Sequence, residues 1–156
     1  MPPLIRPSAA MPDFDSIETG ERLPPIHIGP VERDTLSLFA DASGDHHPAH
    51  VDTEFARRAG MRDVFAHGML GMAWLGRVLT CWAPLSALRT FEARFVGIVH
   101  LGDELLCTGE VSEKLANTSQ RCVRIKLRAI NQSGETKLTG SALVALDNLR
   151  EAKQEA

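Results

Sequence analysis

Residues 68–76 read GMLGMAWLG, and this apolar stretch continues to Ala83 with Arg77 as its single charged residue. A membrane span needs about 20 consecutive apolar residues, so the stretch is too short and is interrupted by a charge. A segment that is apolar on nearly every side is typical of a helix surrounded by the rest of a globular protein. We therefore predict a buried helix over residues 67–82, ended by Pro84.

The second half of the chain has the composition of β-strands. Val123, Ile125 and Leu127 alternate with charged residues, and this period of two is typical of a strand with one buried face. The charged residues between them are predicted to form a solvated face of the sheet. The strand-like segments are 87–99, 103–115, 121–131 and 135–147, and the turns between them fall at 100–103, 116–118 and 131–134.

Shorter elements precede the apolar helix. Residues 24–30 are compatible with a short edge strand between prolines. Residues 31–42 and 52–59 have helical patterns, the first stopping at Gly44 and the second capped by Asp52 or Thr53. Helices followed by an antiparallel meander of four strands favour an α+β fold. We predict a single hot-dog domain, in which an antiparallel sheet wraps around one long central helix.

The bulk properties of the chain agree with one globular domain. It has 156 residues, of which 44% are hydrophobic and 24% charged, and its net charge is -3. We place the domain at residues 19–148, between a flexible N-terminal lead-in over 1–18 and a flexible C-terminal tail over 149–156. The negative charge and the lack of a basic, aromatic stripe argue against binding to nucleic acid.

The cysteines and the N-terminus favour a cytoplasmic protein that is not attached to a membrane. Cys81, Cys107 and Cys122 are odd in number and widely spaced, so we interpret them as reduced thiols of the core. The first residues also lack the continuous apolar stretch that a secretory signal requires.

Residues 42–52, ASGDHHPAHVD, crowd three histidines and two aspartates around a proline. One alternative is a metal site, whose ligands would be Asp45, His46, His50 and the distant His67. The proline disfavours the helix that a histidine pair four residues apart would need, and the glutamate of a zinc helix is missing. We therefore predict no metal. A calcium loop fails because its sixth position holds His46 where glycine is needed.

Two interpretations of this stretch remain. It could be a polar turn between two helices. It could also hold an acid/base pair, because an irregular loop can aim Asp45 and His50 at one water or substrate proton. The density of glycine, proline, aspartate and histidine favours the second interpretation.

Residues 43–50, SGDHHPAH, resemble the hydratase motif of MaoC-like proteins, a family that includes the (R)-specific enoyl-CoA hydratases. That motif runs Ser or Thr, Gly, Asp, any residue, Asn, Pro, any residue, His. Further along, FAHGML at residues 65–70 resembles the His-Gly entry into the central helix of the family. The resemblance covers residues 19–146 and implies the hot-dog fold again.

The resemblance implies three catalytic positions. The family's acid/base pair falls on Asp45 and His50, and the backbone N–H that polarises the thioester carbonyl falls on Gly68. Elementary physical chemistry supports the last role, because a helix N-terminus has unpaired N–H groups and a positive dipole end. These groups would stabilise the enolate-like charge that develops as water adds to the double bond.

The chain departs from the motif at His47, where the family has asparagine. Imidazole can imitate the donor and acceptor roles of an amide, but it also titrates near neutral pH. The predicted substrate-binding residues are Ser43, His47, Phe65, His67 and Met69. Among them, His67 is expected mainly to orient the loop or cap the helix, and Ser43 serves equally well as a turn residue.

The resemblance therefore implies a hydratase, or a dehydratase in reverse, acting on a 2-enoyl thioester. Its partner would be an acyl-CoA or acyl-carrier-protein substrate, with no cofactor beyond the coenzyme A of that substrate. A homodimer that joins two sheets edge to edge is also implied. Two alternatives are a hot-dog thioesterase and a non-catalytic subunit of a hetero-oligomeric hydratase.

Overall fold

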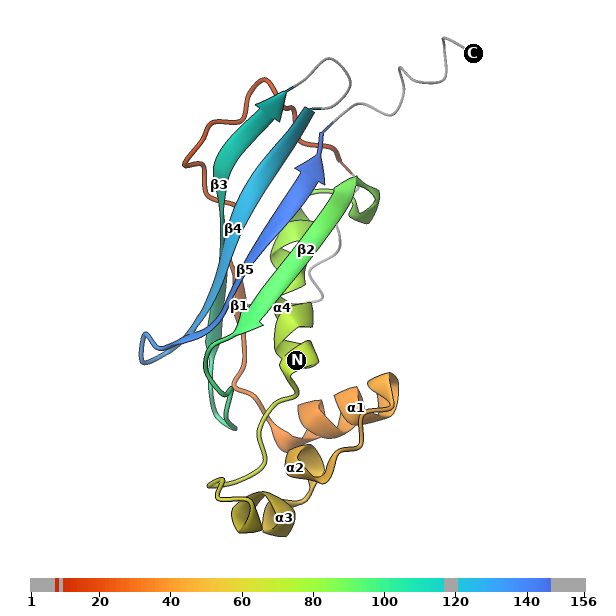
Figure 1. Ribbon diagram of the computed structural model, residues 1–156, viewed down its shortest axis with the longest axis vertical. Coiled ribbons are helices and arrows are strands. Elements are labelled where there is room, and N and C mark those ends of the chain that lie inside the picture. The colour runs from red at the N-terminus through yellow and green to blue at the C-terminus, as the bar shows by residue number, and fades with distance from the viewer. Residues whose placement is uncertain (1–7, 9, 117–120, 147–156) are drawn as a thin grey trace.

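A five-stranded antiparallel sheet curves around one central helix, while three shorter helices gather beyond one end of the sheet (Figure 1). The computed structural model describes residue 8, residues 10–116 and residues 121–146. The strands are β1 (Ile26–Ile28), β2 (Leu88–Phe95), β3 (Leu105–Ala116), β4 (Arg121–Asn131) and β5 (Thr136–Ala145). The predicted α+β architecture, a sheet wrapped around a long helix, is confirmed.

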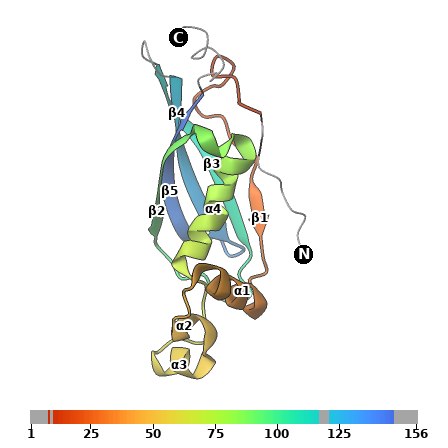
Figure 2. The ribbon, with the colours of Figure 1, turned by 90° about the vertical axis from the view of Figure 1, so that its right-hand side faces the viewer.

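The central helix is α4 (Gly68–Trp82), as the apolar stretch predicts. It lies across one face of the sheet and contacts all five strands (Figure 2). Its glycines allow this close approach, because a Cβ built on Gly71 would lie only 3.2 Å from the side chain of Leu138. The helix ends at Trp82, and the extended Ala83 that follows it is the conformation that Pro84 requires of its neighbour.

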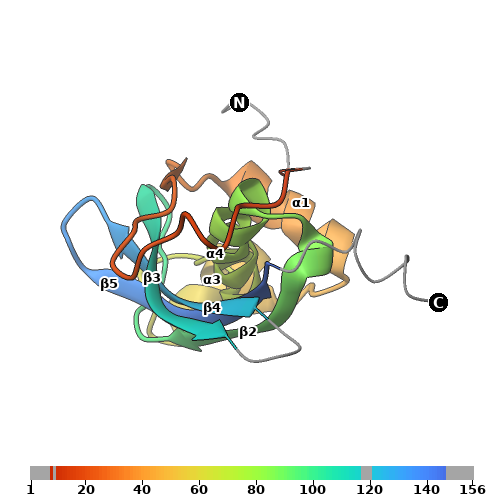
Figure 3. The ribbon, with the colours of Figure 1, turned by 90° about the horizontal axis from the view of Figure 1, so that it is seen from above.

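The sheet presents one face to α4 and the other to solvent. Val123, Ile125 and Leu127 of β4 are buried, whereas the charged residues between them are exposed, which confirms the predicted alternation. Seen from above, the sheet bends around α4 (Figure 3). Apolar burial between these two layers supplies the main stabilisation of the fold.

The predicted meander of four consecutive strands is wrong in one respect. The strand order is β1-β3-β4-β5-β2, so β2 pairs with β5 and not with β3. β1 occupies the free edge of β3, where Ile26 lies opposite Cys107. The turn predicted at residues 100–103 exists, with Gly102 at a φ of 81°, but the strands on either side of it are not neighbours: β2 lies at one edge of the sheet, and β3 is separated from it by β4 and β5.

Three short helices form the other end of the molecule (Figure 2): α1 (Arg33–Ser43), α2 (Pro48–Val51) and α3 (Thr53–Arg58). Gly44 ends α1 in the left-handed conformation at a φ of 74°, and the Asp52 carboxylate caps α3, both as predicted. α2 is a correction, because an irregular loop was expected there. Pro48 opens this one-turn helix at its first position, where its missing N–H costs nothing.

The core extends beyond the predicted start of the domain at residue 19. Phe14 and Ile17 are buried in the same apolar cluster as α4, so residues 14–17 pack as part of the domain. Residues 1–7 and 9 of the predicted lead-in, residues 117 and 118 of the predicted turn and the whole predicted C-terminal tail fall outside the described residues. No helix in the described part of the chain is long and apolar enough to cross a membrane.

Candidate functional site

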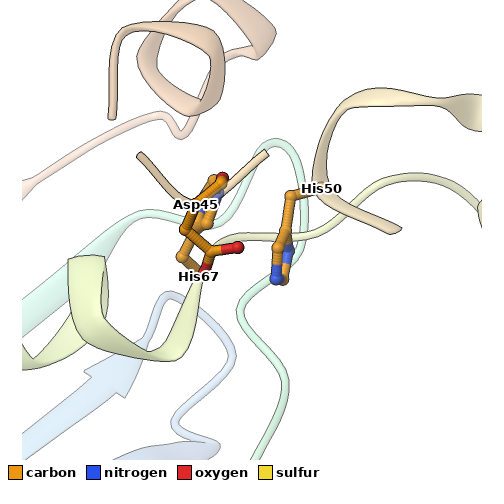
Figure 4. Close-up of side chains that lie close together, drawn as sticks. All are labelled: Asp45, His50 and His67. Carbon is orange, nitrogen blue, oxygen red and sulfur yellow. The ribbon is translucent and has the colours of Figure 1, made fainter. Parts of the chain in front are cut away.

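Asp45, His50 and His67 converge where the short helices meet the first turn of α4 (Figure 4). Asp45 lies in the loop between α1 and α2, His50 lies on α2, and His67 directly precedes α4. One carboxylate oxygen and one ring nitrogen from each histidine all lie within 4.8 Å of one another. The predicted acid/base pair is therefore brought together, with His67 as a third member that was expected only to support it.

The loop that carries Asp45 is shaped by its own polar groups. The Ser43 hydroxyl donates to the Phe39 carbonyl at 2.7 Å and accepts from the Asp45 N–H at 3.2 Å. The Asp45 carboxylate accepts from the His47 N–H at 3.2 Å, which closes an Asx-type turn. Ser43 is thus placed as a turn residue, and its substrate-binding role stays a prediction.

His47 stands at the N-cap of α2. Its Nδ1 accepts a hydrogen bond from the Ala49 N–H at 3.2 Å, as a side-chain oxygen of asparagine does at a helix N-cap. Its ring also meets Phe55 edge to face, with the ring centres 5.7 Å apart. The imidazole therefore reproduces the acceptor role of an amide, and the departure from the motif leaves the turn intact.

His50 is held in one orientation by a backbone carbonyl. Its Nδ1 lies 2.8 Å from the Phe65 oxygen. Because a carbonyl can only accept, Nδ1 carries the proton of the neutral ring and Nε2 keeps its lone pair. Burial lowers the pKa of His50, and the nearby His67 acts in the same direction, against the bond to Phe65 and the charge of Asp45. The neutral, proton-accepting form is favoured.

His67 joins the loop to the central helix. Its side chain is 1% exposed, and its Nε2 donates to the backbone carbonyl of Asp45 at 3.0 Å. Its ring packs against that of His50 with centres 4.0 Å apart. The bond to Asp45 is the contact that the predicted loop-orienting role requires, whereas no side-chain hydrogen bond from His67 caps α4. Its Nδ1 is buried without a hydrogen-bond partner among the described residues.

Gly68 is the first residue of α4 and directly follows His67 of this cluster in the sequence. Within the described residues its N–H has no hydrogen-bond partner, as expected for the first turn of a helix. The ring of Phe95 covers it from the sheet side, 3.4 Å from where a Cβ would be. Met69 follows with an exposed side chain. Nothing in the sequence singled out Phe95, because its proximity arises only when β2 folds onto α4.

The same cluster has the composition of a metal site, but its geometry favours acid/base chemistry. The rings of His50 and His67 stack with a tilt of only 30°, whereas imidazoles that share an ion point their nitrogens at it. One nitrogen of each ring also faces a backbone carbonyl, an arrangement that ligating histidines share, so it does not distinguish the two kinds of site. His46 stays apart from the cluster, with its Nε2 3.9 Å from the Asp41 carboxylate.

Comparison with known proteins agrees with this architecture. The family model described as MaoC like domain matches residues 17–133. The chain is 26% identical over 132 residues to the mitochondrial 3-hydroxyacyl-acyl-carrier-protein dehydratase of Arabidopsis thaliana, a match that spans 80% of each protein.

Two solved structures have the same fold over most of their length. The match to the unliganded R-hydratase PhaJ1 of Pseudomonas aeruginosa has a TM-score of 0.74 at 30% identity and covers 86% of each chain. The (R)-hydratase of A. caviae involved in PHA biosynthesis has a TM-score of 0.69 at 26% identity, over 85% of this chain and 98% of that one. Because the family model matches more than half of the chain, the protein belongs to the MaoC-like dehydratase family of hot-dog hydratases and 3-hydroxyacyl-thioester dehydratases.

Proposed function

We propose that the protein adds water to the double bond of a 2-enoyl thioester to give a 3-hydroxyacyl thioester, or catalyses the reverse dehydration. One observation carries the proposal: the Asp45 carboxylate and a ring nitrogen of His50 converge beside the unpaired N–H groups of α4. A carboxylate and a neutral imidazole can hold one water between them and take its proton. The helix N-terminus supplies the complementary stabilisation of negative charge.

In the hydration direction, the water oxygen bonds to the β-carbon while its proton passes to the acid/base pair. His50 is the proton acceptor, since its Nε2 lone pair is free and its proton-accepting form is favoured by burial. The electrons of the double bond move toward the thioester oxygen, which the Gly68 N–H receives. The proton then returns to the α-carbon. H and OH are added, and the C–S bond of the thioester stays intact.

The relatives point to the carriers that such a substrate could have. The Arabidopsis relative is named for an acyl-carrier-protein thioester, and the A. caviae enzyme for an (R)-hydratase activity. We accordingly propose an enoyl-CoA or enoyl-acyl-carrier-protein substrate and an (R)-configured product.

The test uses crotonyl-CoA and longer enoyl-CoAs, with crotonyl-acyl-carrier protein as a separate arm. Loss of the conjugated enoyl absorbance without release of thiol supports the proposal, and chiral analysis of the product reads its configuration. Release of thiol would instead identify a thioesterase. Asp45→Asn and His50→Gln should each abolish hydration, with His46→Gln as the matched control outside the cluster.

We also propose that two copies associate through the exposed edge of β2. Among the described strands, β2 pairs only with β5, so its other edge has free backbone groups. Phe95, Val96 and Ile98 at its end are large apolar residues that remain exposed. Light scattering should give twice the mass of the chain, and Val96→Lys should shift it toward the mass of one chain. A single-chain mass for the unaltered protein would reject this assembly.

A further inference from the structure

Two oppositely charged side chains are buried at the end of the sheet nearest the short helices, outside the acid/base cluster. Lys137 is 2% exposed and Asp103 is 7% exposed. The Lys137 ammonium lies 3.5 Å from the Asp103 carboxylate and 2.7 Å from the carboxylate of Glu135. Burying such charges is costly, and apolar residues of similar size often give equal or greater stability. Stability alone therefore gives a weak account of this pair.

The Asp103 carboxylate holds a turn closed. One of its oxygens accepts from the His100 N–H at 2.9 Å, and the other accepts from the Asn131 side chain at 3.2 Å. Lys137 anchors the start of the same connection, because its backbone carbonyl accepts from the N–H groups of Val96 and Gly97. Residues 96–104, which cross from β2 to β3, are thus fixed at both ends.

This connection holds the segment that orients His50. The Ala66 N–H donates to the Val99 carbonyl at 2.9 Å, and Phe65 forms an antiparallel bridge with His100. The carbonyl of Phe65 in turn accepts the proton on Nδ1 of His50. A short series of hydrogen bonds therefore leads from the Asp103 carboxylate to the ring nitrogen that sets the tautomer of His50.

The Asp103 backbone also contacts the segment just before α1, the helix that leads to Asp45. Its carbonyl accepts from the Val31 N–H at 2.9 Å, and the Gly102 N–H donates to the Val31 carbonyl at 2.9 Å. Val31 lies two residues before α1, and the loop that carries Asp45 begins where α1 ends. Residues 96–104 thus contact both the segment that orients His50 and the segment that leads into α1, after which Asp45 lies.

We propose that Asp103 and Lys137 are positioning residues, which hold the Phe65 carbonyl where it keeps Nδ1 of His50 protonated and Nε2 free. They contact no substrate, and their effect passes through residues 96–104. The proposal extends the proposed hydratase function, because it names what keeps the base in its proton-accepting orientation.

The main test replaces Asp103 by Asn and reads His50 directly, by 15N NMR of its ring nitrogens in the full chain without substrate. The unaltered protein should show one tautomer with the proton on Nδ1, whereas Asp103→Asn should show a mixture. With crotonyl-CoA, kcat should fall at least tenfold while KM stays within about twofold, because the thioester contacts are untouched. The control is Glu113→Gln, which breaks the exposed ion pair with Arg124, 3.1 Å apart, elsewhere on the sheet.

The double variant Asp103→Asn with Lys137→Met covers the case in which a buried ammonium left, among the described residues, with Glu135 as its single carboxylate partner prevents folding, because it removes that charge as well. It should fold and still show mixed tautomers. A folded variant of either kind that keeps a single Nδ1 tautomer and a kcat within twofold of the unaltered protein would overturn the proposal. The NMR result needs no turnover, so it tests the positioning role independently of the hydratase function. If the hydratase function is wrong, the unaltered protein will be inactive on every enoyl thioester.

Discussion

Gly68→Pro is the substitution that isolates the proposed oxyanion donor. Proline is favoured at the first position of a helix, because its fixed φ suits the helix and the N–H that it lacks has no partner within the helix. The residue before a proline must be extended, and His67 already has a φ of -55° and a ψ of 137°. The substitution should therefore delete one N–H group and leave α4 in place.

The expected loss follows from the role of that group. Removing one donor from an oxyanion hole costs about 10²–10³ in kcat, or about 2.7–4 kcal/mol of transition-state stabilisation. Gly68→Ala is the matched control, because it keeps the N–H and its Cβ would lie 3.4 Å from the Phe95 ring, at ordinary contact distance. We expect Gly68→Ala to lose much less activity than Gly68→Pro.

The assay is steady-state hydration of crotonyl-CoA, with circular dichroism and thermal unfolding as checks on the fold. Both variants should unfold at temperatures close to that of the unaltered protein, so that the difference in kcat reports the missing N–H. If Gly68→Pro folds normally and its kcat is within about fivefold of that of Gly68→Ala, the Gly68 N–H does not stabilise the transition state, and the proposed mechanism is wrong at this step.

Three further predictions concern the same end of the molecule and the core. His47→Ala removes the cap of α2, which is worth about 1 kcal/mol, so kcat should fall. His47→Asn restores an acceptor and should recover most of the lost kcat. His46→Ala is the control. Since His50 must be neutral to accept a proton and burial lowers its pKa, the acid limb of kcat/KM should lie below pH 6.5, the ordinary value for histidine; a limb above it would contradict the role of His50. Burial raises the pKa of the Cys107 thiol to about 12, so a thiol reagent should modify it only in unfolded protein.

Local patterns predicted the elements of this fold better than their pairing. The apolar stretch located α4 to within one residue, and the alternation around Ile125 located β4, because each signal is complete within one segment. The partner of β2 depends on which edge of the sheet the chain enters after α4, and no periodicity encodes that choice. α2 escaped prediction because four residues are too few for a periodic pattern.

The site was predictable where the motif named a side chain. Asp45 and His50 meet as expected, because the loop closed by Ser43 and the cap from His47 are local features of the motif. The Phe65 carbonyl is different, since every residue has a carbonyl and only tertiary packing selects this one for His50. The approach of the His67 ring to His50 likewise joins two segments that are distant in the sequence.

The residues at the start of α4 and the short helix α3 are held by separate contacts, and this separation bears on how the site could be re-engineered. His67 holds the Asp45 loop through its hydrogen bond, and in the proposed mechanism the next residue, Gly68, donates to the thioester oxygen, so two adjacent residues would set the distance from the water to that oxygen. α3 is secured separately, through Thr53 and the ion pair between Arg33 and Asp63 at 2.6 Å. We therefore expect α3 to tolerate insertions and reshaping for bulkier acyl groups, while the distances among Asp45, His67 and Gly68 stay unchanged.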